Sequence, residues 1–246
     1  MTKTEELIGV ISDPEVRKLL NRLHAEASRQ ERWLYFELAR FLPKLLLGKN
    51  LPWEKIGKSL DKKYMSIDPA QGIFCYLLAR SMRAKRIIEF GTSFGVSTIY
   101  LASALRDNGG GLVIGTEMVE AKAQQARENV RQAGLSDFVD IRTGDALDTL
   151  KNESDSVDIL LNDGFPPVAL PVLRIVAPLM REGGVVLTDN VGLFKSDYRE
   201  YLNYIRDPRN GFRSALLSLN EGTEFSVRLN AEQGAPAEGL SPAADR

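Results

Sequence analysis

Two apolar segments of this 246-residue chain each end in residues that could bind a ligand. The first ends in Glu89-Phe90-Gly91, and Gly95 follows at the start of a helical pattern; the next apolar segment ends in Glu117. This order predicts a β-α-β unit with a glycine turn after its first strand. Glycines let a backbone approach a ligand closely, and a helix N-terminus offers free N–H groups. A carboxylate at the second strand's end can accept both hydroxyls of a ribose. We therefore expect a nucleoside-containing cofactor.

Three kinds of site are compatible with the glycine turn. Residues 91–95 fit the G-x-S-x-G nucleophile elbow of hydrolases, but that chemistry needs a histidine after the serine, and the only histidine is His24. A G-x-G-x-x-G turn would cradle a pyrophosphate, but here Ser93 stands where a middle glycine would be. An acid, a Gly-x-x-x-Gly turn and Glu117 suit S-adenosylmethionine, which has no phosphate. We favour S-adenosylmethionine, with its amino acid end over the turn.

Polar residues also follow the next two expected strands. One strand ends in Asn162-Asp163 and the following one in Asp189-Asn190. Two carboxylates and one amide oxygen, without Cys or His, suit Mg²⁺, Mn²⁺ or Ca²⁺ better than zinc. The alternative is that Asp189-Asn190 only shapes a turn, as such residues often do. Because Asp163 lies at the matching strand tip, we favour a metal site.

Composition restricts the class of protein. The chain is 43% apolar and 26% charged, which suits one large α/β domain. Its 32 Lys and Arg nearly balance its 33 Asp and Glu, so neither nucleic acid nor an anionic membrane is expected as a partner. No apolar run reaches the length of a membrane span, and the N-terminus lacks a signal-peptide core. The sole cysteine, Cys75, lies in an apolar stretch and fits a reducing compartment. We expect a cytoplasmic protein.

The chain divides into three expected parts: a helical segment (1–63), a cofactor-binding domain (64–230) and a disordered tail (231–246). Asp13-Pro14 predicts a helix start, and a second amphipathic run extends from Trp33 to Leu47, with Pro43 kinking or dividing it. This segment carries more apolar side chains than two surface helices need. We expect it to cover the active-site edge and to form a homodimer, through a set that includes Trp33, Phe36, Phe41, Leu45, Leu46 and Trp53.

The middle part alternates strand and helix patterns. Strands are expected at 86–90, 111–117, 138–143, 157–162, 184–188, 214–219 and 225–230, and helices at 72–83, 95–106, 119–133, 167–180 and 197–206. The link between the last two strands is too short for a crossover, so one of them must be antiparallel to its neighbour. The fold class is therefore α/β, a doubly wound seven-stranded sheet with one reversed strand near its edge.

With these motifs in place, the chain resembles the cation-dependent class I O-methyltransferases, the group that contains catechol O-methyltransferase and the caffeoyl-CoA and bacterial small-molecule relatives. The resemblance extends from about Tyr64 to Leu229. It rests on residues 65–72, Glu89-Phe90-Gly91, Thr116-Glu117-Met118, Thr143-Gly144-Asp145-Ala146, Asn162-Asp163-Gly164 and Thr188-Asp189-Asn190-Val191.

The resemblance implies a role for each matching residue. The methionine half of S-adenosylmethionine would be lined by Met65, Ile67, Glu89, Gly91, Ser93 and Ser97. Glu117 would bind the ribose, Met118 would lie against the adenine, and Gly144, Asp145 and Ala146 would cover its far edge. Asp163, Asp189 and Asn190 would be the metal ligands, with Asp163 also near the donor's amino group and assigned as the catalytic residue. The implied reaction is a direct methyl transfer to an acceptor oxygen held by the metal.

One departure from the family concerns the general base. Relatives carry a lysine three residues after the first metal aspartate, whereas this chain has Pro166 after Asp163. Proline cannot accept a proton, and Lys195 is the nearest downstream lysine on that edge. The departure favours an acceptor that needs no strong base, such as an acidic phenol, a carboxylate or an amine. It also leaves open a donor-binding protein that has lost methyl transfer, although three retained metal ligands argue against this.

Overall fold

The computed structural model describes residues 3–53, 56 and 66–229, with all their side chains except those of residues 30–38 and 45. The predicted cofactor residue Met65, the predicted disordered tail (231–246) and the side chains of Trp33 and Phe36 lie outside this part of the chain. Among the residues described, no helix has the length and apolar character that crossing a membrane requires.

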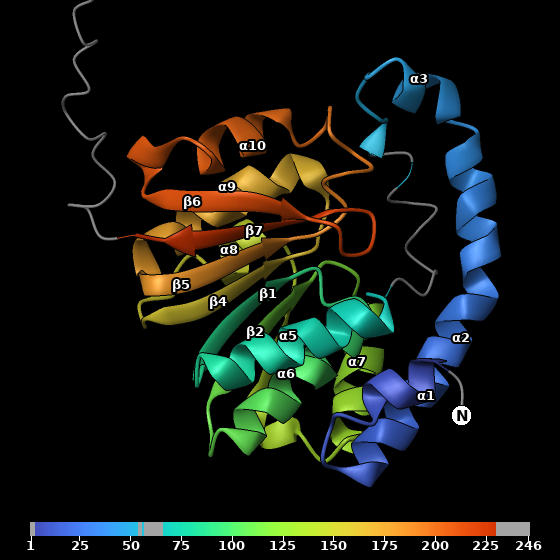
Figure 1. Cartoon of the computed structure of the whole chain (residues 1–246). Coiled ribbons are helices and arrows are strands. Elements are labelled where there is room, and N and C mark those ends of the chain that lie inside the picture. The colour runs from blue at the N-terminus through green and yellow to red at the C-terminus, as the bar shows by residue number, and fades with distance from the viewer. Residues whose placement is uncertain (1–2, 54–55, 57–65, 230–246) are drawn as a thin grey trace, which may run out of the picture.

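A seven-stranded sheet forms the centre of the molecule (Figure 1). Its strands lie in the order β3-β2-β1-β4-β5-β7-β6. β7 is antiparallel to β5 and β6, and the other neighbours are parallel. The predicted reversed strand next to the edge is confirmed. The strands are β1 (Arg86–Phe90), β2 (Leu112–Glu117), β3 (Val139–Thr143), β4 (Val157–Asn162), β5 (Met180–Thr188), β6 (Phe212–Leu217) and β7 (Thr223–Arg228).

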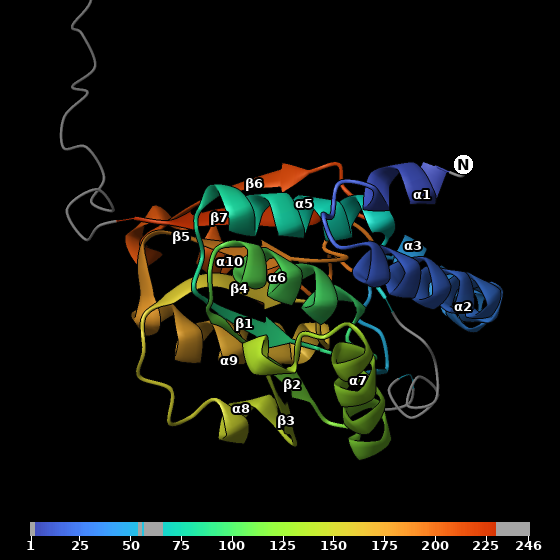
Figure 2. The same ribbon diagram turned by 90° about the horizontal axis from the view of Figure 1, so that it is seen from below.

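Helices cover both faces of the sheet (Figures 1 and 2). Consecutive residues of β1 alternate between the faces: Ile87 packs with α1, α2, α5, α6 and α7, and Ile88 packs with α8, α9 and α10. Both residues are fully buried, as expected for a parallel strand between two helical layers. The helices are α1 (Lys3–Ile8), α2 (Pro14–Ala39), α3 (Leu42–Leu46), α5 (Pro69–Ser81), α6 (Val96–Asp107), α7 (Glu120–Gln132), α8 (Ala146–Thr149), α9 (Pro166–Val176) and α10 (Arg199–Ile205).

The N-terminal helices differ from the expected pattern. α2 is one continuous helix of 26 residues, which joins the first expected helix to most of the second amphipathic run. The helical conformation is interrupted by a turn at residues 40–41, before Pro43. Pro43 itself lies in the first turn of α3. A proline at that position loses no helical hydrogen bond, so it favours the start of α3. The run is thus divided beside Pro43, which is one of the two outcomes we predicted, and it is not kinked. Figure 1 shows α2 and α3 beyond the carboxyl ends of the parallel strands.

Two further differences concern the end of one helix and the presence of another. The helix expected at 167–180 ends at Val176, because Ala177–Leu179 form a 3₁₀ turn and β5 already begins at Met180. The short helix α8 was not expected, because four residues are too few to show a period. Neither difference moves the tips of β1 to β5, so the carboxyl edge of the parallel strands forms where the sequence places it. The strands β6 and β7 each lie two residues before their expected ranges, 214–219 and 225–230.

Candidate cofactor and metal site

The glycine turn after β1 brings three strand ends together. Gly91 has a φ of 97°, and a Cβ there would lie 2.4 Å from the carbonyl oxygen of Asp163. Gly91 and Thr92 both donate their N–H groups to the Thr116 carbonyl, at 3.2 and 3.1 Å. Gly95, with a φ of 80°, precedes α6, and no side chain caps that helix. Only glycine combines these backbone angles with so close an approach, so the turn leaves the N-terminus of α6 free for a ligand.

Glu117, at the tip of β2, has a carboxylate that is fixed by backbone donors. Its Oε2 accepts from the Ser93 N–H at 2.8 Å, and its Oε1 accepts from the Val119 N–H at 2.8 Å. The residue is 9% exposed. Each oxygen retains a further lone pair, because a carboxylate offers about four acceptor sites. Glu117 is therefore oriented in advance and able to accept two hydroxyl groups.

Glu89, in β1, is a fully buried carboxyl below the turn. Its Oε2 accepts from the hydroxyls of Thr92 and Thr98, whereas its Oε1 has no hydrogen-bond partner within the part of the chain described. Burial raises the pKa of Glu89, and the nearby hydroxyl groups of Ser97, Thr98 and Thr92 act against this rise. An unpartnered oxygen in a buried carboxyl is costly unless a donor arrives from elsewhere. The hydroxyl of Ser93 is likewise buried without a partner among the described residues.

The other predicted cofactor residues lie around the same sheet edge. On the side of α5, Ile67 is 2% exposed and Ser97, in the first turn of α6, is 5% exposed. On the side of β3, Gly144 donates its N–H to the Glu117 carbonyl at 2.9 Å, and Asp145 caps α8 by accepting from Leu147 N. Beside them, Ala146 is buried and Met118 has 63% of its surface exposed. Hydrogen bonds thus join Ser93 and Gly144 directly to Glu117.

The three predicted metal ligands meet at the tips of β4 and β5. The Asn190 Nδ2 lies 2.9 Å from Asp189 Oδ2 and 3.5 Å from Asp163 Oδ1. Asn190 has a φ of 59°, a left-handed conformation that asparagine tolerates better than most residues. The part of the chain that is described contains no cluster of three His, Cys, Asp or Glu that could hold a metal ion, so any site here uses two carboxylates and an amide.

Burial dominates the electrostatics of this pair of carboxyls. It raises the pKa of Asp163 well above its usual range, and the nearby carboxyls of Asp189 and Glu89 raise it further. Burial also raises the pKa of Asp189, against the opposing effect of hydrogen bonds from Gln71, Asn220 and Thr223. No Lys or Arg of the described residues forms an ion pair with Asp163 or Asp189. The site therefore concentrates negative charge without a protein cation.

Aromatic side chains lie beside the metal-ligand group. Phe165, which follows Asp163 in the chain, is 42% exposed, and its ring lies 5.9 Å from that of Trp53. Trp53 also meets Phe194 edge-on at 5.0 Å and donates its Nε1–H to Asp197 at 2.7 Å. Part of the N-terminal segment thus packs on the loops that follow Asp163 and Asn190. Trp53 belongs to the apolar N-terminal set expected from sequence, but its partners were not expected, because they lie far away in the chain.

None of the described residues Pro166, Lys195 and Tyr198 is placed as a base that could substitute for the lysine that relatives carry. Pro166 is the buried first residue of α9, a position that proline favours. Lys195 is exposed. Tyr198 lies in the same region, but burial, together with the charges of Asp163 and Asp189, raises the pKa of its hydroxyl well above the usual value. Tyr198 therefore stays protonated at neutral pH.

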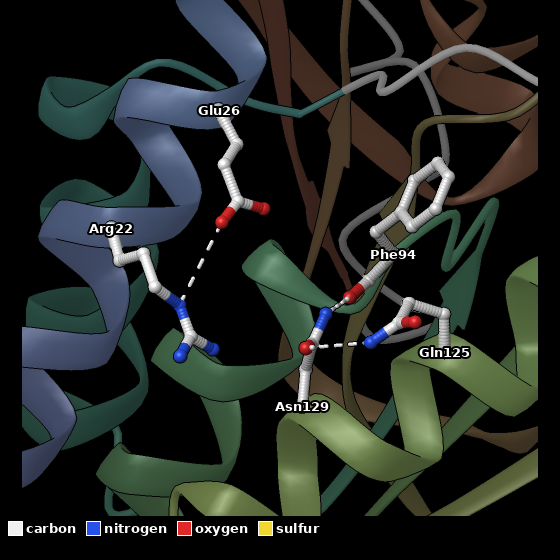
Figure 3. A pocket seen from close by; sticks show the side chains of 5 residues that line it. All are labelled: Arg22, Glu26, Phe94, Gln125 and Asn129. Carbon is white, nitrogen blue, oxygen red and sulfur yellow. Dashed lines mark hydrogen bonds and ion pairs between the residues drawn. The ribbon is translucent and has the colours of Figure 1, made fainter.

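A pocket of about 270 Å³ lies between α2, α7 and the glycine turn (Figure 3). It is lined by Arg22, Glu26, Phe94, Gln125 and Asn129. The buried Asn129 donates to the Phe94 carbonyl at 2.9 Å and accepts from Gln125 at 3.2 Å, as the dashed lines in Figure 3 show. The Asn129 amide therefore has a partner for both its N–H group and its oxygen, and its bond to the Phe94 carbonyl holds the glycine turn against α7.

Comparisons with known proteins agree with this arrangement. A family model described as "Methyltransferase domain" matches residues 88–191, from β1 to the loop after β5. The chain is 37% identical over 131 residues to a catechol O-methyltransferase of Niastella koreensis and 34% identical over 128 residues to a catechol O-methyltransferase of Mycobacterium tuberculosis. Each match covers 52% of this chain, and 58% and 57% of these relatives respectively. The matched region is thus less than two thirds of either relative.

A solved structure extends the likeness over most of the fold. The O-methyltransferase of Bacillus cereus in complex with SAH is 25% identical, with a TM-score of 0.62 over 84% of this chain and 99% of that one. The strand order of the sheet, the glycine turn after β1 and the region matched by the family model all indicate the same fold. The fold is therefore that of the class I O-methyltransferases, and residues 88–191 match the methyltransferase-domain family model.

Proposed function

We propose that this protein transfers a methyl group from S-adenosylmethionine to a small-molecule acceptor, at a phenol or carboxylate oxygen, with the help of a divalent cation. The observation that supports this proposal best is the Glu117 carboxylate, which two backbone N–H groups hold at the tip of β2 beside the glycine turn. This is the arrangement that a ribose needs.

The residues present fit S-adenosylmethionine. The buried Glu89 has an oxygen without a partner among the residues described, and the donor's ammonium group could supply the missing hydrogen bond. Gly91 leaves space that a Cβ would fill, so the donor can lie against the backbone. The exposed Met118 offers an apolar surface for the adenine. Because S-adenosylmethionine has no phosphate, a turn with only two glycines is sufficient.

When bound, S-adenosylmethionine supplies a methyl group on a cationic sulfur, which makes the transfer a direct displacement. Orientation is the main contribution left to the protein. Glu117 would fix the ribose end and Glu89 the amino acid end, so that the methyl group faces the tips of β4 and β5.

The residues at those tips fit a divalent cation. Asp163 and Asp189 carry raised pKa values and have no Lys or Arg partner in the described chain, so a cation would relieve their repulsion. The amide of Asn190 now donates to both carboxylates; half a turn about its Cβ–Cγ bond would present its oxygen instead and release a lone pair on each. A buried Gln71 oxygen nearby also has no partner among the residues described. All of these are hard oxygen ligands.

A cation at this place would hold the acceptor oxygen and lower its pKa. Asp163, Asp189 and Asn190 would fix the position of the cation, and Phe165 and Trp53 would form an apolar wall beside it. Because Pro166 cannot take the acceptor's proton, the acceptor should be more acidic than catechol or be a neutral nucleophile. Pro166 also supports a second candidate function, that of a protein that binds the donor without transferring its methyl group.

Removal of the cation tests the metal part of the proposal. Chelation should abolish methyl transfer, and added Mg²⁺ or Mn²⁺ should restore it. Asp189→Ala should abolish transfer at every metal concentration, whereas Asp155→Ala, an exposed site remote from these tips, should retain it. Full activity of the chelated protein and of Asp189→Ala would contradict the metal assignment.

The N-terminal segment has a proposed role in assembly and in covering the site. The contacts of Trp53 with Phe165 and Phe194 support a lid function for part of this segment. Exposed leucines of α3 and the following residue support a homodimer. We further propose a cytoplasmic location, since the single cysteine, Cys75, is buried and unpaired.

A further inference from the structure

The turn between β6 and β7 contacts a candidate metal ligand. Asn220, in this turn, donates its Nδ2–H to Asp189 Oδ2 at 3.1 Å. Thr223, the first residue of β7, has its hydroxyl 3.2 Å from Asp189 Oδ1. The Gln71 Nε2–H, from the first turn of α5, donates to the Thr223 hydroxyl at 3.4 Å. Asn220 and Thr223 therefore bond the Asp189 carboxylate directly, and Gln71 reaches it through Thr223.

Backbone packing fixes the turn in this position. The Val191 N–H donates to the Gly222 carbonyl at 3.0 Å, one residue after Asn190. A Cβ on Gly192 would lie 2.2 Å from the Glu221 carbonyl oxygen, so the two loops touch where only glycine fits. Asn220 has a φ of 48°, a conformation that asparagine adopts more readily than most residues. The turn is thus built against the loop after Asn190, at the carboxyl end of the parallel strands (Figure 1).

Thr223 links the other two donors. Its hydroxyl accepts from Gln71 Nε2 at 3.4 Å and has a single proton to donate. Two acceptors lie in range of that proton, the Leu219 carbonyl at 3.3 Å and Asp189 Oδ1 at 3.2 Å. A charged acceptor makes the stronger bond, so an ionised Asp189 takes the proton. The result is a chain of hydrogen bonds from Gln71 through Thr223 to Asp189, all buried.

The two candidate metal carboxylates are held very differently. Asp163 Oδ1 has one long contact, at 3.5 Å, with the Asn190 amide. Asp189 keeps its bonds from Asn220 and Thr223, and Gln71 keeps its bond to Thr223, even when Asn190 turns its oxygen toward a cation. We propose that Gln71, Asn220 and Thr223 are positioning residues that fix the Asp189 carboxylate for the cation. This inference rests on the proposed metal role of Asp189.

Hydrogen-bond donors that orient the Asp189 carboxylate should raise the affinity of the site for a metal ion. A ligating carboxylate that loses its outer hydrogen bonds is free to rotate, and such changes typically weaken metal binding by roughly 10–100-fold. Thr223→Val keeps the branched shape and removes the hydroxyl. Asn220→Gly keeps the left-handed backbone and removes the amide. Neither substitution touches the donor site around Glu117, so S-adenosylmethionine should bind these variants as it binds the native protein.

The experiment titrates Mn²⁺ into the full-length native protein and its variants by calorimetry, with a parallel titration of S-adenosylmethionine. We expect about tenfold weaker Mn²⁺ binding by Thr223→Val and by Asn220→Gly. Thr223→Ser should bind as the native protein does, since it restores the hydroxyl. Thr149→Val is the matched control, because the Thr149 hydroxyl is buried without a partner among the described residues and lies at the end of α8.

The outcomes separate this inference from the metal proposal. If the native protein binds no Mn²⁺, the metal role itself is wrong, and the positioning role fails with it. If the native protein binds Mn²⁺ and both Thr223→Val and Asn220→Gly bind it equally well, only the positioning role is wrong. Weaker binding in Thr223→Val that Thr223→Ser does not share, with unchanged S-adenosylmethionine affinity, would support the assignment.

Discussion

At the scale of single residues, the proposed cofactor site depends most on Glu117. Its position at the end of β2 follows from the apolar pattern, but the sequence does not show the two backbone N–H groups that orient it. Those groups come from Ser93 and Val119, and each donates to one oxygen of the carboxylate. They leave the acceptor sites that a ribose would use.

The first prediction is that Glu117→Ala weakens S-adenosylmethionine binding by at least about tenfold. Each hydrogen bond from a hydroxyl to a carboxylate contributes about 1.5–3 kcal/mol at best, and two would be lost. Glu120→Ala is the matched control, because Glu120 is an exposed carboxylate at the start of the adjacent helix. Calorimetry would measure both variants. Equal affinity of Glu117→Ala and the native protein would refute the cofactor assignment.

The second prediction concerns Pro166. A positioned base typically contributes roughly 10²–10⁴ in rate, and neither Pro166 nor the protonated Tyr198 can provide one. Turnover of catechol should therefore be much lower than turnover of acidic phenols or carboxylates, and Pro166→Lys should raise it. Initial rates on matched acceptors would measure this. Fast catechol turnover by the native protein would show that another group is the base, and Lys195→Ala would then test that exposed lysine.

At the scale of elements, strands and helices could be predicted where the repeat of apolar residues lies within a short stretch of the sequence. The strand β1, the glycine turn and the tip of β2 lie within 32 residues, Arg86 to Glu117, and all were expected from sequence. The contacts of the β6–β7 turn with Asp189 were not expected, because residues about 30 positions apart leave no local pattern. The sequence predicted a helix from Pro14 and a separate run from Trp33 to Leu47 that Pro43 kinks or divides, whereas α2 continues from Pro14 to Ala39 and Pro43 lies at the start of α3.

The packing of α2 on α6 gives the third prediction. His24 Nε2 lies 2.9 Å from the Tyr100 hydroxyl, and burial lowers the pKa of His24 to about 4, while Asp68 acts in the opposite direction. A lowered pKa means that folded His24 stays neutral, so its contribution is fully present above about pH 6.5. It is lost as the pH falls toward 4, by about 3 kcal/mol at most.

This acid sensitivity can be isolated by comparing two proteins. The free energy of unfolding should fall between pH 6.5 and 4 more steeply in the native protein than in His24→Gln. Denaturant titrations at several pH values would measure the difference. Tyr100→Phe should keep most of the sensitivity, because it leaves His24 buried. Parallel curves for the native protein and His24→Gln would contradict the assignment.

At the scale of the whole molecule, the N-terminal segment divides its apolar residues between two surfaces. Leu51 and Trp53 pack toward the loops beside the candidate metal site, and Asp197 holds both through its carboxylate. Leu42, Leu46 and Leu47 are 51%, 78% and 68% exposed. Such a group on the surface of a monomer suggests a protein interface.

The fourth prediction is that the protein is a homodimer through this surface. Light scattering at micromolar concentration should give twice the chain mass of 27.3 kDa. Replacement of Leu46 and Leu47 by serine should shift the mass toward the monomer, whereas Leu77→Ser, at an exposed leucine of α5, should not. A monomer mass for the native protein would refute the dimer and leave the lid role to be tested separately.

Methyl transfer itself is the central claim, and mass spectrometry of the products tests it most directly. The protein would be incubated with S-adenosylmethionine, Mg²⁺ and a panel of acidic phenols, carboxylates and amines, beside Glu117→Ala and a chelated sample. We predict that at least one acceptor gains the mass of a methyl group in the native reaction alone. Tight S-adenosylmethionine binding with no methylated product on any acceptor class would contradict the account and favour a donor-binding protein.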